Sequence, residues 1–319
     1  MQDSLTYCLS AATEVTPIAD LTDWCPRWQA LAAGGHAPVA LAMRGGFAAD
    51  RVGWAFAAGY QGALRALLAR HAGYAAGAGE LFAMCATEAA GNRPRDIHTT
   101  LSVTQDSLTV SGEKSWTTLG PAASAFLVVG RIGGDRDDAA SPSLKVALVP
   151  ASAPGIHFQD KPPIEFVPEI PHTGSRFDAV ALGSDALLPG DGYSDYVKPF
   201  RTVEDTYIAL AVQAWLLREA RARQWPLAFQ QQLAAQLVTL ATLADSDWSS
   251  AATHLALAGA LERSQELYQQ ATGYFDQAPA GDPVAQRWHR DRPLFRVASK
   301  PRELRAERAW QRLRDAPRS

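Results

Sequence analysis

The sequence predicts an α+β fold in which a helical region is followed by a β domain and then by a helical bundle. Two observations predict this order. Residues 81–188 hold short runs rich in Val, Leu, Phe and Thr, separated by Gly, Pro, Asn and Asp, a pattern typical of strands. The flanking residues are rich in Ala and Leu and repeat apolar side chains at helical spacing. We therefore expect a helical region at 1–80, a small β-barrel at 81–188 and a helical bundle at 189–319.

The composition indicates a globular protein of the reduced cytoplasm. Hydrophobic residues make up 47% and charged residues 20% of the 319 positions, which is enough to bury a large core. A net charge of −3 argues against binding to nucleic acid or to an anionic membrane. No apolar run reaches the ~20 residues that a membrane helix needs, and the N-terminus lacks a signal pattern. The three cysteines, Cys8, Cys25 and Cys85, have no metal-binding spacing.

The first helices are predicted from start signals and periodicity. Asp20 precedes a segment that we expect to be helical as far as Leu31, with acidic residues near its beginning. Residues 34–38, which contain two glycines and a proline, predict a break. The strongest helix is expected at 50–71, whereas residues 4–16 have mixed polarity and could be extended.

The β domain is predicted to be a small antiparallel barrel or sandwich, because its strands are many and short. Residues 111–113, Ser-Gly-Glu, are expected to form the turn of a hairpin, and residues 133–142 a solvated loop. The expected strands are 81–87, 100–104, 108–110, 114–119, 125–131, 143–150 and 175–181.

The C-terminal bundle is expected to begin at Thr202. Thr202 is predicted to be the N-cap of a long helix that continues to Arg223, and Asp205 stands three residues later, where a capping box has its acidic member. The dipeptide Trp225-Pro226 should end this helix. Further helices are expected at 230–244, 249–274 and 302–313.

Two segments could bind a planar ligand. Residues 84–88 read Met-Cys-Ala-Thr-Glu, and residues 114–118 read Lys-Ser-Trp-Thr-Thr. The hydroxyl and backbone groups of Thr87 and Thr118 would meet the polar edge of such a ligand, and Trp116 would offer a flat face for stacking. Two ordinary strands would read in the same way, because Thr and Trp are common β-formers.

Together these segments resemble the flavin-contacting segments of the acyl-CoA dehydrogenase family. In that family a strand ending in Thr-Glu-Pro-Gly precedes a strand that reads Gly-Glu-Lys-x-Trp-Ile-Thr. Residues 177–180, Phe-Asp-Ala-Val, followed by Leu-Pro-Gly at 188–190, are similar to a later strand and loop of the family. The resemblance extends from about residue 50 to the C-terminus. It implies the same fold with a shortened N-terminal helical region.

The resemblance also implies a cofactor and a reaction. Met84, Ala86 and Thr87 would face the edge of the isoalloxazine ring of FAD, Trp116 would lie on its face, and Thr118 would approach its N5 side. The reaction would be α,β-desaturation of acyl-CoA or another acyl thioester. The implied partners are an electron-transfer flavoprotein and other copies of the chain in a homodimer or homotetramer.

Such a dehydrogenase needs a carboxylate that removes a proton next to the thioester carbonyl. Most family members place it after an Arg-Asp pair, which corresponds here to Arg290 and Asp291, but the matching position is Ser299. A few members use a Glu near the start of the first C-terminal helix, which corresponds to Glu204. We therefore expect Glu204 to be the catalytic base. A Glu in a first helical turn would equally serve the helix dipole.

Several other residues are weaker candidates. Lys198, Arg201 and His172 stand beside segments that border the family's substrate channel, although His172 is more typical of a turn. Glu88 is expected to be structural. Arg93 and Arg95 could bind a phosphate, but an exposed loop would look the same. The family's nucleotide-binding motifs are only partly present, at 221–226 and 270–274.

Two alternatives remain open at this point. A flavin-dependent monooxygenase on the same scaffold would need no carboxylate base, which suits Ser299. A binding subunit without catalysis would suit the shortened N-terminus and the incomplete nucleotide motifs. Flavin absorption by the purified protein would separate the second alternative from the enzymes.

Overall fold

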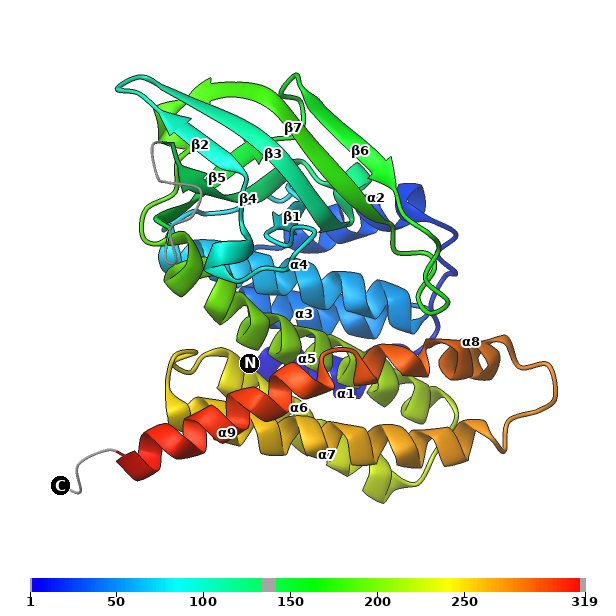
Figure 1. Ribbon diagram of the computed structural model, residues 1–319. Coiled ribbons are helices and arrows are strands. Elements are labelled where there is room, and N and C mark those ends of the chain that lie inside the picture. The colour runs from blue at the N-terminus through cyan, green and yellow to red at the C-terminus, as the bar shows by residue number, and fades with distance from the viewer. Residues whose placement is uncertain (1, 134–141, 316–319) are drawn as a thin grey trace. The chain divides into compact units, whose positions relative to one another are not determined.

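The computed structural model describes residues 2–133 and 142–315, so most of the solvated loop expected at 133–142 lies outside the described residues (Figure 1). Contacts between residues divide the chain into two compact units. We call them the helical unit, residues 1–63, 164–169 and 202–319, and the β unit, residues 64–163 and 170–201. The division into three domains stays a prediction.

The N-terminal region is helical from its beginning. Its helices are α1 (Gln2–Ser10), α2 (Leu21–Ala32), α3 (Pro38–Ala48) and α4 (Val52–His71). The side chain of Asp20 caps α2 by accepting hydrogen bonds from the N–H groups of Thr22 and Asp23, as the sequence predicts. The extended conformation expected for 4–16 is wrong for residues 4–10, because they belong to α1, which buries Ser4 and Cys8 on one side. Helix α3 was not predicted, although Pro38 suits its first turn.

Glycines let two of these helices approach α5 (Lys198–Ala222) closely. A Cβ atom on Gly59 of α4 would lie 2.7 Å from the backbone of Ile208, and one on Gly46 of α3 would overlap the backbone of Ala211. Any larger residue would therefore force the helices apart. This close packing explains why α4 carries glycines at its contact with α5.

The C-terminal helices follow the prediction except at the beginning of α5 and at α8, which was not predicted. They are α5, α6 (Leu227–Ala244), α7 (Ala251–Phe275), α8 (Pro283–Asp291) and α9 (Ser299–Asp315). The expected N-cap at Thr202 is wrong. Helix α5 already begins at Lys198, directly after a π-helical turn over Gly192–Val197 that Asp191 caps. Thr202 is thus an interior residue, and its carbonyl accepts a hydrogen bond from the Thr206 hydroxyl.

In the part of the β unit that the structure describes, seven strands form one curled sheet (Figure 1). They are β1 (Phe82–Cys85), β2 (Thr100–Val103), β3 (Ser107–Thr118), β4 (Ala125–Ile132), β5 (Leu144–Pro150), β6 (Ile156–Asp160) and β7 (His172–Gly183). The order is β1-β4-β2-β3-β7-β6, and β5 pairs with β4. The sheet is mixed, because β1 and β2 both run parallel to β4. The antiparallel expectation is wrong for these two pairings, and β6 was missed.

The turn expected at 111–113 is also wrong. Residues 107–118 form one long strand, β3, which is paired with β7 on both sides of Gly112. The register shifts at Gly112, whose φ of 149° lies in the region that favours glycine, and a Cβ there would lie 2.6 Å from the Cα of Thr99. The glycine therefore marks a bulge that bends the strand, not a reversal of the chain.

The fold class is confirmed: helices come first, a curled β-sheet follows, and a helical bundle ends the chain. Apolar side chains from six strands form one buried core of the β unit, among them Cys85, Leu101, Phe126, Val149 and Phe177. No helix within the described ranges is long and apolar enough to span a membrane.

Candidate functional site

The two predicted ligand-binding segments meet in the β unit. The backbone N–H of Ser115 in β3 donates a hydrogen bond of 2.7 Å to the carbonyl oxygen of Thr87, just after β1. Strands β1 and β3 are not neighbours in the sheet. This bond therefore places the end of one segment directly beside the middle of the other.

Alternation along the strands divides these residues between two faces. Cys85 and Thr117 point toward the β core, where the Cys85 sulfur lies 3.5 Å from the Thr117 hydroxyl, which in turn bonds Ser175 at 2.7 Å. Met84 and Ala86 therefore point away from the core, as do Trp116 and Thr118, which flank Thr117. We call the face that carries these four side chains the outer face.

Trp116 is the most accessible of the four. Its side chain is 43% exposed, whereas Met84 and Ala86 are buried and Thr118 is half-buried. The ammonium group of Lys161, just after β6, lies 5.4 Å from the centre of the Trp116 ring. The edge of His172 meets the same ring, with 5.9 Å between ring centres and an angle of 75° between the planes. The indole is thus held between two side chains while much of its surface remains open.

Thr118 and His172 form a hydrogen-bonded pair next to this indole. They are register partners at the ends of β3 and β7, and the Thr118 hydroxyl lies 3.1 Å from Nδ1 of His172. Burial lowers the pKa of His172 below its usual value, which favours the neutral imidazole. The prediction that His172 is typical of a turn is wrong, because it is the first residue of a strand.

A buried ion pair supports the outer face from behind. The Lys114 ammonium donates hydrogen bonds of 2.6 Å to the Glu88 carboxylate and to the Val129 carbonyl. Glu88 also accepts bonds from the backbone N–H groups of His98 and Thr99. Burial alone would raise the pKa of Glu88, but Lys114 and these donors hold it below its usual value. Both carboxylate oxygens of Glu88 thus accept hydrogen bonds from within the β unit, which agrees with the structural role expected from the sequence.

The basic loop after Glu88 is anchored by another arginine. Arg131 of β4 is buried and donates hydrogen bonds to the carbonyls of Arg95 and Ile97. The side chains of Arg93 and Arg95 are exposed, and Arg95 lies 3.6 Å from Asp96. Phosphate binding by these two arginines stays a prediction.

Glu204 belongs to the helical unit, where it lies in the second turn of α5 and is half-buried. It therefore lacks the first-turn position that the sequence analysis assumed. The adjacent Asp205 is not part of a capping box. Its carboxylate binds Arg302 at 2.7 Å and Arg305 at 2.8 Å, which fastens α9 to α5. Asp205 is thus structural, and the role of Glu204 as a base stays a prediction.

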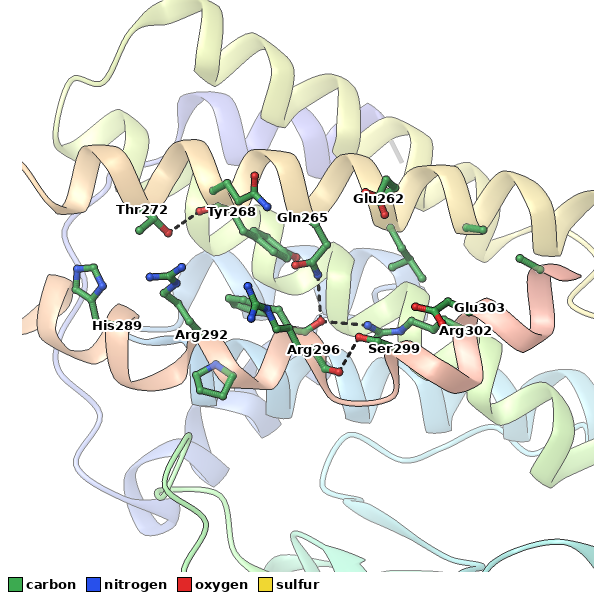
Figure 2. A pocket seen from close by; sticks show the side chains of 16 residues that line it. Glu262, Gln265, Tyr268, Thr272, His289, Arg292, Arg296, Ser299, Arg302 and Glu303 are labelled. Carbon is green, nitrogen blue, oxygen red and sulfur yellow. Dashed lines mark hydrogen bonds between the residues drawn. The ribbon is translucent and has the colours of Figure 1, made fainter.

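Ser299 lies in a groove of about 780 Å³ between α7 and the segment that runs through α8 into α9 (Figure 2). Its hydroxyl donates a hydrogen bond of 2.7 Å to the carbonyl of Arg296. Two carboxylates, Glu262 of α7 and Glu303 of α9, also line the groove. Sequence reasoning missed both, because each is one of many charged residues on a helix surface.

The Arg290-Asp291 pair has a structural use within the helical unit. The fully buried carboxylate of Asp291 accepts a hydrogen bond of 2.8 Å from the backbone N–H of Val167, and Arg290 binds both Asp291 and Glu169. Together these bonds hold residues 164–169, which connect β6 to β7, against the helices of that unit. Burial raises the pKa of Glu169 despite the nearby Arg290.

The partial nucleotide motifs are also occupied by internal contacts. Arg221 donates a hydrogen bond of 2.9 Å to the carbonyl of Cys8, and Arg223 pairs with Asp282 and Glu219. The Tyr274 ring stacks on Trp225, with 5.1 Å between ring centres. These three side chains stabilise the helical unit itself.

The residues of the outer face fit the ring of a flavin. An open indole suits stacking, and hydroxyl groups suit the polar edge of an isoalloxazine. Lys161 adds a cation beside the indole, and sequence reasoning missed it because β6 was not predicted.

Comparison with known proteins agrees with this fold. The sequence profile of the acyl-CoA dehydrogenase middle domain matches residues 83–180. A search of curated protein sequences gives no match. A solved FAD-dependent dehydrogenase is 17% identical, with a TM-score of 0.68 and coverage of 98% of this chain and 97% of that one.

Two further solved structures share the fold. The prolyl acyl carrier protein oxidase AnaB is 13% identical, with a TM-score of 0.67 and 96% coverage of each chain. Butyryl-CoA dehydrogenase from Megasphaera elsdenii is 16% identical, with a TM-score of 0.64 and coverage of 85% of this chain and 80% of that one. The resemblance to the acyl-CoA dehydrogenase family is therefore confirmed, through the middle domain at 83–180 and the fold over nearly the whole chain.

Proposed function

We propose that the chain is a flavoprotein that binds FAD through the outer face of its β unit and oxidises an acyl thioester. The observation that carries this proposal is the half-exposed indole of Trp116 beside the Thr118–His172 pair. A large aromatic surface left open next to hydrogen-bonding groups is typical of a site for a planar, amphipathic ligand.

In this proposal each residue has a defined task. Trp116 stacks on the ring, Thr118 bonds its polar edge, and Met84, Ala86 and Thr87 border it. Glu204 removes the proton next to the thioester carbonyl. When bound, FAD supplies the acceptor for a hydride. The butyryl-CoA and acyl carrier protein enzymes of the same fold support a thioester substrate on either carrier.

The test begins with the purified protein. Its absorption spectrum should show bound flavin, or excess FAD should raise its melting temperature. Ligand at 100 times its dissociation constant stabilises a protein by about 2.7 kcal/mol. Absence of both effects would contradict the proposal. Anaerobic loss of the yellow absorption on addition of acyl-CoAs or acyl carrier proteins would then identify the substrate carrier.

A second candidate, a subunit without dehydrogenase activity, is favoured by one observation. Ser299, Arg221 and Arg223 occupy family-like positions but serve internal hydrogen bonds. Flavin that binds but is never reduced by any thioester would support this candidate. Oxygen-dependent hydroxylation with reduced flavin would instead indicate a monooxygenase.

The partners belong to the same proposal. Electron-transfer flavoprotein would reoxidise the cofactor, and the chain would form a homodimer or homotetramer in the cytoplasm. The three cysteines are free, as a reducing compartment requires. Sedimentation that shows a monomer at micromolar concentration would exclude the oligomer.

A further inference from the structure

The Thr118–His172 pair is built so that the direction of its hydrogen bond can reverse. Both side chains lie on the outer face, 3.1 Å apart between Oγ1 and Nδ1, and His172 also touches Trp116. A neutral imidazole carries its proton on either Nδ1 or Nε2. Nδ1 can therefore donate to the Thr118 oxygen or accept from the Thr118 hydroxyl.

Each direction leaves Thr118 with a different free group. When Nδ1–H donates, the Thr118 proton is free to be donated to a ligand. When Nδ1 accepts that proton, the Thr118 oxygen is free to accept from a ligand N–H. His172 thus decides whether Thr118 acts as a donor or as an acceptor.

A flavin requires both roles at one place, because its N5 is an acceptor when oxidised and an N–H donor when reduced. We propose that His172 is a positioning residue that, by exchanging tautomers, lets Thr118 bond the polar edge of FAD in both redox states. The inference rests on the proposed function. In the exchange one proton leaves Nδ1 and another enters at Nε2 from water, so the protonation of the pair does not change. Nε2 has no protein partner within the described ranges, which leaves it open to this exchange.

Loss of the imidazole should weaken the reduced state more than the oxidised one. Without Nδ1, a Thr118 that accepts from N5–H has no acceptor for its own proton, and an unmatched donor is costly when buried. In His172→Leu we expect the affinity for reduced FAD to fall about tenfold relative to oxidised FAD. For a two-electron couple this corresponds to a midpoint potential about 30 mV lower.

The experiment compares midpoint potentials of FAD-loaded proteins, with folding checked by thermal melting. His172→Asn is the matched variant, because its side-chain amide can donate or accept and should keep the potential near that of the wild type. A double-mutant cycle with Thr118→Ala tests whether His172 acts on the midpoint potential through Thr118. Once the Thr118 hydroxyl is gone, His172→Leu should cause no further shift of the potential.

The outcomes separate the two proposals. If the wild-type protein does not bind FAD, the proposed function fails, and this inference fails with it. If FAD binds but His172→Leu leaves the potential unchanged, only the inference is overturned. Equal shifts in the Asn and Leu variants, or an unchanged shift in the Thr118→Ala background, would likewise overturn it.

Discussion

Residues that resemble the family's motifs have different surroundings in two parts of the molecule, the outer face of the β unit and the C-terminal part of the helical unit. On the outer face, Trp116 remains half-exposed and the Thr118 hydroxyl bonds a neighbouring imidazole. In the helical unit, Arg221, Arg223 and Asp291 are used by ion pairs and backbone hydrogen bonds. The difference teaches that the proposed ring binding and the proposed proton abstraction depend on different parts of the chain. Each can be lost without the other.

The largest expected effect is on proton abstraction. Glu204→Gln keeps the shape of the side chain but removes the base, and a general base contributes roughly 10²–10⁴-fold in rate. We expect anaerobic flavin reduction by the cognate thioester to fall by about this factor while FAD binding is unchanged. Ser299→Ala is the matched control and should reduce flavin at the wild-type rate. Flavin reduction at the wild-type rate in Glu204→Gln would exclude Glu204 as the base. The helical unit would then have no assigned part in proton abstraction.

The next effect is on the support behind the outer face. Lys114→Met leaves the Glu88 carboxylate buried without its cation, and the side chains of the pair are only 0% and 8% exposed. Breaking one partner of a buried pair costs about 3–5 kcal/mol of unfolding free energy. Chemical denaturation should show this loss. Arg263→Ala, which breaks a pair whose side chains are 39% and 53% exposed, should cost less than about 1 kcal/mol. Equal losses of unfolding free energy in the two variants would mean that the buried pair stabilises the protein no more than the exposed pair does.

A smaller effect is expected on FAD affinity when the indole of Trp116 is removed. Trp116→Ala removes the stacking partner, and stacking of an aromatic side chain on a planar base is worth about 1–3 kcal/mol. We expect FAD affinity measured by fluorescence titration to fall accordingly, with little change in melting temperature because the indole is half-exposed. Trp310→Ala removes an indole of α9 that is 57% exposed and should leave affinity unchanged. A fall in both variants would argue against a specific site on the outer face.

The smallest effect is a pH dependence in the helical unit. Hydrogen bonds from Arg223 lower the pKa of Asp282 from 3.8 to about 2. A carboxyl group with a lowered pKa contributes stability that is present above its unfolded pKa and is lost as pH falls toward the folded one. Asp282→Asn keeps the N-cap of α8 and should remove this contribution, which is below about 1 kcal/mol because the pair is partly exposed. A difference in unfolding free energy between the two proteins that does not shrink as pH falls from about 4 to about 2 would contradict the assignment.

Sequence reasoning predicted the strands that carry the outer face well, because the signals of these strands are local. Strand β1 and the Trp116 segment were predicted from β-forming residues and from motif order, and both lie in strands. The turn at 111–113 failed because Gly112 has the same composition signal in a bulge as in a hairpin. Whether a glycine bends or reverses a strand depends on β7, more than 60 residues later.

The helical unit was harder to predict because its determinants are distant in sequence. Thr202 has the form of an N-cap, but the preceding π-helical turn lets α5 begin four residues earlier. The partners of Asp205 are Arg302 and Arg305, about 100 positions away. Nothing near Asp205 distinguishes a capping residue from one that fastens two helices together.

The close packing of α3 and α4 against α5 has a consequence for biosynthesis. Gly46 and Gly59 pack against Ala211 and Ile208, which lie about 150 residues later in the chain. During translation these two apolar helices leave the ribosome long before α5 exists, whereas residues 64–201 hold every strand of the sheet. We therefore expect the nascent chain to depend on chaperones until α5 emerges, and to fold its β unit first.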